Sequence, residues 1–284
     1  PNVPNTPNAP NAAPAPPAAA ATEGPMPAPD AAGAAAPFDT LPACVARHAA
    51  ERPAATALVV GGTVLDWRTL HALARRAAAA LQRDGLRPGQ VLAIAAGSSV
   101  AHVALWLGAL RAGAVVAPLP PSATPAQLRA MAEDGPAAWL AVDAAVAAAL
   151  DAAAAWPDGA VHRLLLDDAP AQAAPPALPR WAGWLAPEEA PVQPVTIAPE
   201  QAFNVIYSSG TTGTPKGIVQ SHAMRWAHVQ RARLSGYGPD SVTLLATPLC
   251  SNTTLVALVP TLAFGGTAVL MPRFDAGGYL ALAE

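Results

Sequence analysis

A run of small and hydroxyl-bearing residues from Tyr207 to Gly217 is the segment best suited to chemistry, reading Tyr-Ser-Ser-Gly-Thr-Thr-Gly-Thr-Pro-Lys-Gly. Its glycines let the backbone approach a ligand closely, because glycine has no Cβ and accepts positive φ. Successive backbone N–H groups in such a turn form a concave anion site, and the hydroxyls add further donors. The lysine adds a positive charge at the end of the run. This combination predicts a loop that binds the phosphates of a nucleotide.

The residues predicted to contact phosphate are the small, hydroxyl-bearing or charged positions of this run. Two of them, Lys216 and Thr211, are the candidate catalytic residues. A flexible turn is the ordinary interpretation of a Gly/Ser/Thr-rich segment, but here the small residues are contiguous and end in Pro-Lys-Gly before an apolar strand. That order favours phosphate binding. The full candidate set is Ser208, Ser209, Gly210, Thr211, Thr212, Gly213, Thr214, Lys216 and Gly217.

The spacing excludes a P-loop of the Walker type. That loop needs a glycine, four residues, and then Gly-Lys-Ser/Thr. Counting from Gly210, the second glycine position holds Pro215, and Lys216 is followed by Gly217. The run also leads into an apolar strand and does not open a helix directly. The sequence therefore predicts a different kind of phosphate loop.

Residues 208–217 resemble the signature of the adenylate-forming (AMP-binding) superfamily, which includes acyl-CoA synthetases, luciferases and the adenylation domains of peptide synthetases. That signature runs hydroxyl, Ser, Gly, Thr/Ser, Thr, Gly, any residue, Pro, Lys, Gly, and this chain matches every position. Weaker similarities support it at 64–70, 87–89, 107–119 and 264–270. The resemblance covers residues 38–284 and is to the N-terminal portion of an acyl-CoA synthetase-like protein.

The resemblance implies an AMP-forming acid–thiol ligase that uses ATP and Mg²⁺. A small-molecule carboxylic acid would attack the α-phosphorus, giving an acyl adenylate and pyrophosphate, and a thiol would then take the acyl group. The acceptor that the resemblance implies is coenzyme A, which would place the protein in fatty acid metabolism. Because an anion must approach a highly charged nucleotide, donors must neutralise the departing pyrophosphate. The expected contacts are Ser208, Ser209, Thr211, Thr212 and Lys216.

The segment Cys250, Ser251 and Asn252 is a possible acyl pocket. It follows Pro248-Leu249, where many acyl-CoA ligases carry an aromatic-histidine pair, and here the residues are small. This departure leaves the acid open. His222, at a helix start just after the loop, is interpreted as a packed or capping residue more than as a base.

Two other functions remain open. The first is an adenylation domain of a peptide or polyketide synthetase, in which a carrier-protein thiol takes the acyl group. The second is a non-catalytic nucleotide-binding fragment. The later acidic motif, ribose-binding aspartate, hinge and C-terminal lysine of the family are not found in the 284 residues. We therefore expect the chain alone to be incomplete and inactive. The oligomeric state is not predicted.

The order of elements predicts an α/β fold with two mostly parallel, doubly wound βαβ sheet layers, incomplete at the C-terminus. Residues 1–37 are expected to be a disordered Pro/Ala-rich tail. Residues 38–284 are expected to form the N-terminal part of an AMP-binding domain. Within it we expect a first α/β subdomain at 38–168, a connector at 169–200, and the phosphate loop with the start of a second α/β subdomain at 201–284.

Apolar periodicity predicts the individual elements. Helices are expected over 39–50, 68–83, 98–110, 124–133, 144–154, 221–234 and 254–264. Strands are expected over 56–60, 63–67, 91–95, 114–117, 138–142, 161–166, 202–206, 217–220, 242–245 and 267–270. Trp181 and Trp184 are expected to pin the connector to the body of the protein.

Composition narrows the class of protein. The net charge of −3 gives no basic footprint for nucleic acid. Cys44 and Cys250 have no disulfide or metal-site spacing, so we expect two buried thiols in a reducing, cytoplasmic location and no protein-bound metal. The stretch from Ser241 to Met271 has no charged residue, but prolines, glycines and polar groups interrupt it. No membrane span is therefore expected.

Overall fold

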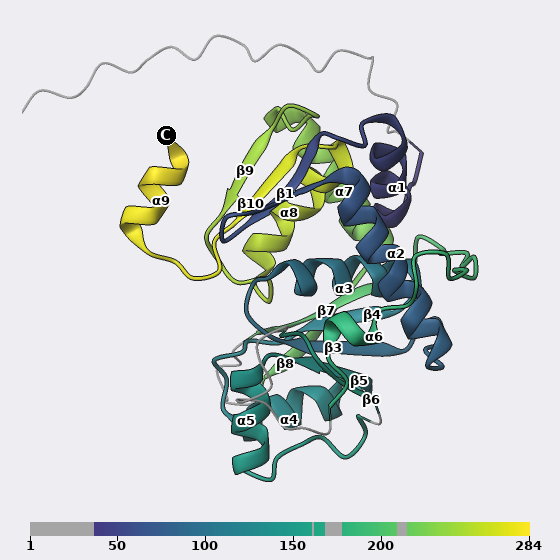
Figure 1. Cartoon of the computed structure of the whole chain (residues 1–284), viewed down its shortest axis with the longest axis vertical. Helices are drawn as coiled ribbons and strands as arrows, with labels where there is room; N and C mark the ends of the chain where they lie inside the picture. The colour runs from purple at the N-terminus through teal and green to yellow at the C-terminus, as the bar shows by residue number, and fades with distance from the viewer. Residues whose placement is uncertain (1–36, 161, 168–177, 209–214) are drawn as a thin grey trace, which may run out of the picture. The chain divides into compact units, whose positions relative to one another are not determined.

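Two sheets organise the computed structural model, which describes residues 37–160, 162–167, 178–208 and 215–284 (Figure 1). The chain divides into two units at the boundary between Ala36 and Pro37. The fold described below is that of the second unit, Pro37–Glu284. The tail predicted over 1–37 lies outside the described residues except for Pro37, so its disorder stays a prediction.

The larger sheet has six strands in the order β6-β5-β3-β4-β7-β8. All neighbouring pairs are parallel except β7 and β8, which form an antiparallel hairpin. The central strands are almost wholly buried and apolar, as expected for parallel strands covered on both faces. The strands are β3 (Val91–Ala95), β4 (Val115–Pro118), β5 (Ala137–Val142), β6 (His162–Leu165), β7 (Ala202–Ser208) and β8 (Lys216–Ser221).

The smaller sheet has the order β2-β1-β10-β9 and joins strands from both ends of the described chain. Strands β1 (Thr56–Val60) and β2 (Thr63–Asp66) form an antiparallel hairpin. Gly61 and Gly62, both with positive φ, make its turn. Strand β10 (Thr267–Leu270) is parallel to both β1 and β9 (Val242–Leu245). Two mostly parallel layers are thus confirmed, and each sheet takes strands from both sides of the connector.

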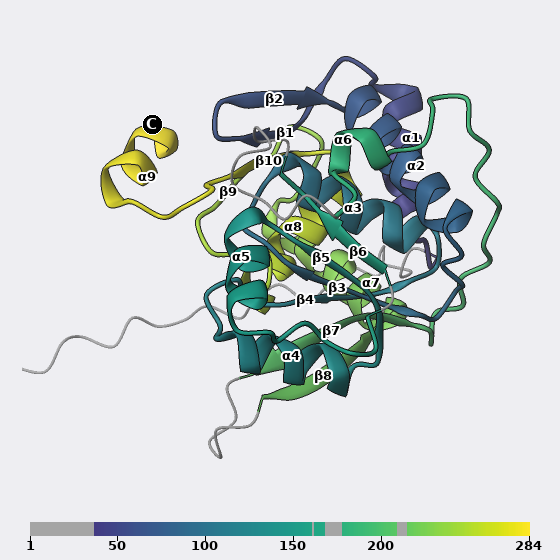
Figure 2. The same cartoon turned by 60° about the horizontal axis from the view of Figure 1, so that its bottom comes forward.

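Helices cover both faces of the six-stranded sheet. Along β3, Leu92 and Ile94 belong to one apolar cluster, whereas Ala93 and Ala95 belong to another. The first cluster includes residues of α1 (Leu41–Glu51), α2 (Trp67–Arg83), α3 (Val100–Arg111), α7 (His222–Ala232) and α8 (Asn252–Phe264). The second lies under α4 (Pro125–Asp134) and α5 (Ala144–Ala152), on the other side of the sheet (Figure 2). This arrangement confirms the doubly wound fold.

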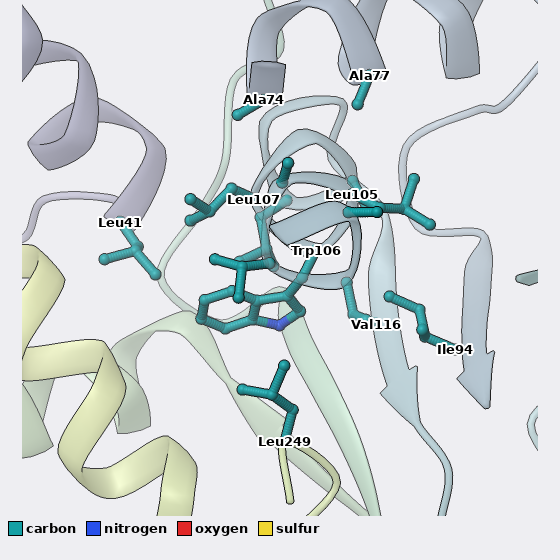
Figure 3. Packing of buried hydrophobic residues seen from close by; sticks show 14 of the residues in the cluster. Leu41, Ala74, Ala77, Ile94, Leu105, Trp106, Leu107, Val116 and Leu249 are labelled. Atoms are coloured by element: carbon teal, nitrogen blue, oxygen red, sulfur yellow. The ribbon is translucent and has the colours of Figure 1, made fainter. Parts of the chain in front are cut away.

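Close packing of α2 on α3 forms the centre of the core. A Cβ added to Gly108 would lie 2.7 Å from both the carbonyl oxygen of Ala74 and the Cβ of Ala77, so small residues allow the two helices to approach. On the sheet side of α3, the indole of Trp106 packs with Leu249 opposite it (Figure 3). Leu249 directly precedes the candidate acyl-pocket segment, so the core fixes where that segment begins.

The predicted elements are confirmed to within about two residues, with a few differences. Helix α8 begins at Asn252, two residues before its predicted start, because Ser251 caps it. Helix α7 ends at Ala232 and continues as a 3₁₀ turn, η1 (Arg233–Ser235). Two short helices, α6 (Trp181–Trp184) and α9 (Ala276–Ala283), were not predicted.

Both tryptophans of the connector are buried, which confirms that they pin it to the body. The indole N–H of Trp184 donates to Asp84 Oδ2 at 2.8 Å. In the described ranges, no helix combines the length and apolar character needed to cross a bilayer.

Candidate functional site

The β7–β8 hairpin presents the predicted phosphate loop at its tip. Ser208, the last residue of β7, pairs with Lys216, the first residue of β8, and both are exposed. Gly217 is the next position of β8. The hairpin therefore brings the two ends of the loop together. Six of the predicted phosphate contacts lie between those ends and outside the described residues: Ser209, Gly210, Thr211, Thr212, Gly213 and Thr214.

The base of this loop is anchored to helix α4 by Tyr207. Its phenol O–H has two acceptors, the carbonyl oxygen of Met131 at 2.7 Å and Asp134 Oδ2 at 3.1 Å. Burial and the hydrogen bond to Asp134 raise the pKa of Tyr207, so the phenol is neutral and acts as a donor. A Cβ on Gly217 would come within 3.2 Å of the Tyr207 ring. Close packing against Tyr207 therefore favours glycine at position 217, apart from any role in phosphate binding.

A buried polar cluster lies at the other end of the hairpin. Arg225 of α7 is 2% exposed, and its Nε donates to Asn204 Oδ1 of β7 at 2.9 Å. Its Nη2 donates to Gln220 Oε1 of β8 and to Asn252 Oδ1 of α8, the latter at 3.1 Å. Asn204 also donates to Gln220 at 3.1 Å. The cluster ties the hairpin to the first turn of α8.

The charge of Arg225 is not balanced by a carboxylate within this cluster. All its acceptors are neutral amide oxygens, and burial lowers the pKa of its guanidinium to about 10. The side chain therefore stays protonated at neutral pH. Sequence reasoning missed Asn204, Gln220 and Arg225, although an amide inside an apolar strand is a usable signal for such a cluster.

The structure places the three possible acyl-pocket residues together at the start of α8. Ser251 is the N-cap and its hydroxyl accepts from the backbone N–H of Thr253 at 3.2 Å. Asn252 directs its amide oxygen to Arg225. Cys250 is half-buried, and burial raises the pKa of its thiol. Cys44 is fully buried, so the prediction of two buried thiols holds for Cys44 and is wrong for Cys250.

His222 is a packed residue, as its sequence position predicted. It follows the N-cap Ser221, is buried, and its ring centroid lies 5.0 Å from that of Phe203. Burial lowers the pKa of His222 to about 4, so it is neutral at pH 7. Over the described residues, no three His, Cys, Asp or Glu side chains converge as metal ligands.

Comparison with known proteins adds an independent finding. The family model described as "AMP-binding enzyme" matches residues 45–282. Surfactin synthase subunit 2 of Bacillus subtilis is 32% identical over 192 residues, which are 68% of this chain and 5% of that protein. Feruloyl-CoA synthase of Amycolatopsis sp is 30% identical over 243 residues, or 84% of this chain and 45% of that protein. This chain thus spans less than half the length of either relative.

The fold has counterparts among solved structures. Fatty acyl CoA synthetase of Mycobacterium tuberculosis superposes with a TM-score of 0.70 at 23% identity. The match covers 86% of this chain and 47% of that one. This similarity concerns the fold.

Proposed function

This chain belongs to the AMP-binding enzyme family, and from that premise we propose that it serves the ATP-dependent activation of a carboxylic acid to an acyl adenylate. The observation that carries the proposal is the β7–β8 hairpin, which brings Ser208 and Lys216 together at the ends of a loop rich in glycine and hydroxyls. We propose that the backbone N–H groups, the hydroxyls and the lysine of this loop bind one anion together.

The proposed roles of the loop residues follow from charge. Ser208 and Lys216 border the loop, and their exposed side chains can contact a ligand at the tip of the hairpin. A hydroxyl and an ammonium group at these two positions fit a polyphosphate ligand. Lys216 and Thr211 are proposed to stabilise the charge that develops on the departing pyrophosphate. Mg²⁺ is proposed to arrive on the nucleotide phosphates, because it prefers phosphate oxygens and water as ligands. The remaining proposed contacts are Ser209, Gly210, Thr212, Gly213, Thr214 and Gly217.

The acid is proposed to bind near Cys250, Ser251 and Asn252, at the start of α8. The Arg225 cluster supports this placement, because it fixes Asn252 relative to the hairpin that carries the phosphate loop. A thiol then takes the acyl group from the adenylate, and we propose coenzyme A as that thiol. Feruloyl-CoA synthase and indoleacetate–CoA ligase, each matched over about 44–45% of its length, support this acceptor. A cytoplasmic location and a place in fatty acid metabolism stay predictions.

A carrier-protein thiol is the second candidate acceptor. Surfactin synthase subunit 2 and the phosphinothricin tripeptide synthetase PhsB are each 32% identical to this chain. Peptide synthetases therefore support an adenylation domain of an assembly line as strongly as the CoA ligases support a free-standing ligase. The adenylation step is common to both proposals.

We propose that residues 38–284 are the N-terminal part of an AMP-binding domain. The finer division stays a prediction: a first α/β subdomain at 38–168, a connector at 169–200, and the phosphate loop with the start of a second α/β subdomain at 201–284. The 284 residues lack the family's motifs for adenine, ribose and metal, so the chain alone is proposed to bind phosphates without completing adenylation. A non-catalytic fragment is the alternative that this property leaves open.

The test is carboxylate-dependent exchange of labelled pyrophosphate into ATP, with a panel of aryl, fatty and dicarboxylic acids. The chain alone should give no exchange. The same chain joined to the remaining C-terminal part of feruloyl-CoA synthase should give exchange that Lys216→Ala abolishes. A folded, active fusion that is indifferent to Lys216→Ala would contradict the proposed site. Adding coenzyme A or a carrier protein then identifies the acceptor.

A further inference from the structure

A groove beside helix α7 is not used by the proposed phosphate site. It has a volume of about 360 Å³, within the range of small-molecule sites. It lies along the C-terminal half of α7, the following 3₁₀ turn and one exposed residue of α8. Its lining residues are His228, Arg231, Ala232, Ser235, Tyr237 and Val256.

The groove lies on a basic face of α7. Arg225, His228 and Arg231 recur every three residues, so they lie along one side of the helix. Burial, together with the charges of Arg225 and Arg231, lowers the pKa of the His228 imidazole. At neutral pH the imidazole is therefore uncharged, and the positive charge beside the groove is that of the two arginines.

No carboxylate of the described residues pairs with these arginines. None of the ion pairs among described residues involves Arg225, His228 or Arg231, and no acidic group shifts the pKa of Arg225 or His228. Two nitrogens on this face, Arg225 Nη1 and His228 Nδ1, are buried without a hydrogen-bond partner in the described residues. Both nitrogens are out of reach of a ligand in the groove, so the group that a ligand can pair with is the exposed guanidinium of Arg231, which has no carboxylate partner among the described residues.

The lining also has an apolar side. Ala232 and Val256, which is 38% exposed, are part of the lining and can cover methylene groups. Ser235 and Tyr237 add hydroxyls that can donate to an oxygen ligand. A purely hydrocarbon tail would bury Arg231 against apolar atoms and remove its hydration, which is unfavourable. A short chain that ends in an anion satisfies both sides of the groove.

We propose that this groove binds the distal carboxylate of a short dicarboxylic acid, with Arg231 and His228 as its recognition residues. That the diacid is also the substrate rests on the proposed function. The binding of a distal carboxylate rests only on the groove. Arg225 is buried and does not touch the ligand; its charge adds to the field at the groove, and its bond to Asn252 holds α8 beside it.

The test is isothermal titration of the whole chain, without nucleotide, in a buffer free of carboxylate and phosphate. Glutarate and pentanoate are the matched probes, since they differ only in the second carboxylate, and inorganic phosphate is the third. Glutarate should bind at least about tenfold more tightly than pentanoate, as expected for charge-assisted hydrogen bonds. Arg231→Gln should remove that preference. The control is Arg233→Gln, because Arg233 is exposed at the start of η1 and does not line the groove; this variant should retain the preference.

Three results would overturn the proposal. Equal affinity for glutarate and pentanoate would show that the second carboxylate is not recognised. A preference that survives Arg231→Gln in a folded variant would place the site elsewhere. Phosphate binding as tight as glutarate, with the same dependence on Arg231, would identify a general anion site. Because ATP is absent, none of these results depends on whether the phosphate loop functions as proposed.

Discussion

The α2–α3 core and the β7–β8 hairpin region are built in opposite ways. In the core, α3 is buried along almost its whole length, and Gly108 lets it approach the alanines of α2. In the hairpin region, which comprises β7, β8, α7 and the first turn of α8, the buried centre contains Asn204, Gln220 and Arg225. On the outside of β8, Ile218 and Val219 are 50% and 63% exposed.

The difference shows where stability and chemistry are located. Buried apolar area is the main favourable term in folding, so the α2–α3 core should dominate the free energy of unfolding. A buried, unpaired guanidinium and an exposed apolar strand contribute little or oppose folding. Such features persist where they position a ligand site, and here they flank the predicted phosphate loop.

The largest expected effect is on the core side of the comparison. Leu105 is fully buried in α3, so Leu105→Ala removes apolar contacts and leaves a cavity. It should lower the free energy of unfolding by about 2–5 kcal/mol. Leu280 of α9 is 65% exposed, so Leu280→Ala is the matched control. This substitution should change the free energy of unfolding by less than about 0.5 kcal/mol. Urea denaturation measures both, and equal effects would refute the assigned core.

A pH effect should be next in size, and it involves both regions. Burial lowers the pKa of His102 in α3, and that of His222 in α7, to about 4 in each case. The unfolded chain takes up these protons near pH 6.5, so stability is full above that pH and falls as pH decreases toward 4. Each histidine contributes up to about 3 kcal/mol.

Denaturation midpoints measured between pH 7.5 and 4.5 test this expectation. His102→Asn should flatten the pH dependence, because asparagine does not titrate while its amide can still donate to the Gly97 carbonyl that His102 Nδ1 contacts at 3.1 Å. An unchanged slope in this variant would mean that His102 is not held neutral by burial.

The two regions also differ in how well the sequence predicted them. Apolar periodicity located β3, β4 and α3 to within two residues, because buried parallel strands and their helices follow simple repeats. Strand partners were not predictable from such repeats. β1 pairs with β10 across about 210 residues, and local pattern carries no information about that distance.

The candidate site was predicted in part. The phosphate loop was predicted because its residue order is specific, and the hairpin joins its two ends, while phosphate binding by the loop stays a prediction. The Arg225 cluster was not identified, because a single arginine in α7 has the same local pattern whether its side chain is exposed or buried. Burial at Arg225 depends on β7, β8 and α8 meeting around it.

Substitution in the loop should change function without changing stability. Replacing both Thr211 and Thr212 with Val keeps their shape and removes two proposed hydroxyl donors to phosphate. Hydrogen bonds to charged groups contribute about 1.5–3 kcal/mol each, so pyrophosphate exchange by the fusion with feruloyl-CoA synthase should fall at least about tenfold. A folded double variant with full exchange would remove these residues from the site.

The smallest expected effect comes from deleting residues 1–37. Eleven prolines and few large apolar side chains leave this segment little to bury. The thermal midpoint of residues 38–284 should equal that of the whole chain within error. A decrease of several degrees would show that the tail packs on the folded part.

The central claim is that the hairpin binds phosphate while the α2–α3 core provides stability. Thermal unfolding with and without Mg²⁺-pyrophosphate tests it directly, because a ligand that binds only the folded state raises the midpoint. Lys216→Gln should keep the ligand-free midpoint and lose the ligand-induced rise, whereas Leu105→Ala should lower the midpoint and keep the rise. A Lys216→Gln protein that retains the full rise would contradict the account.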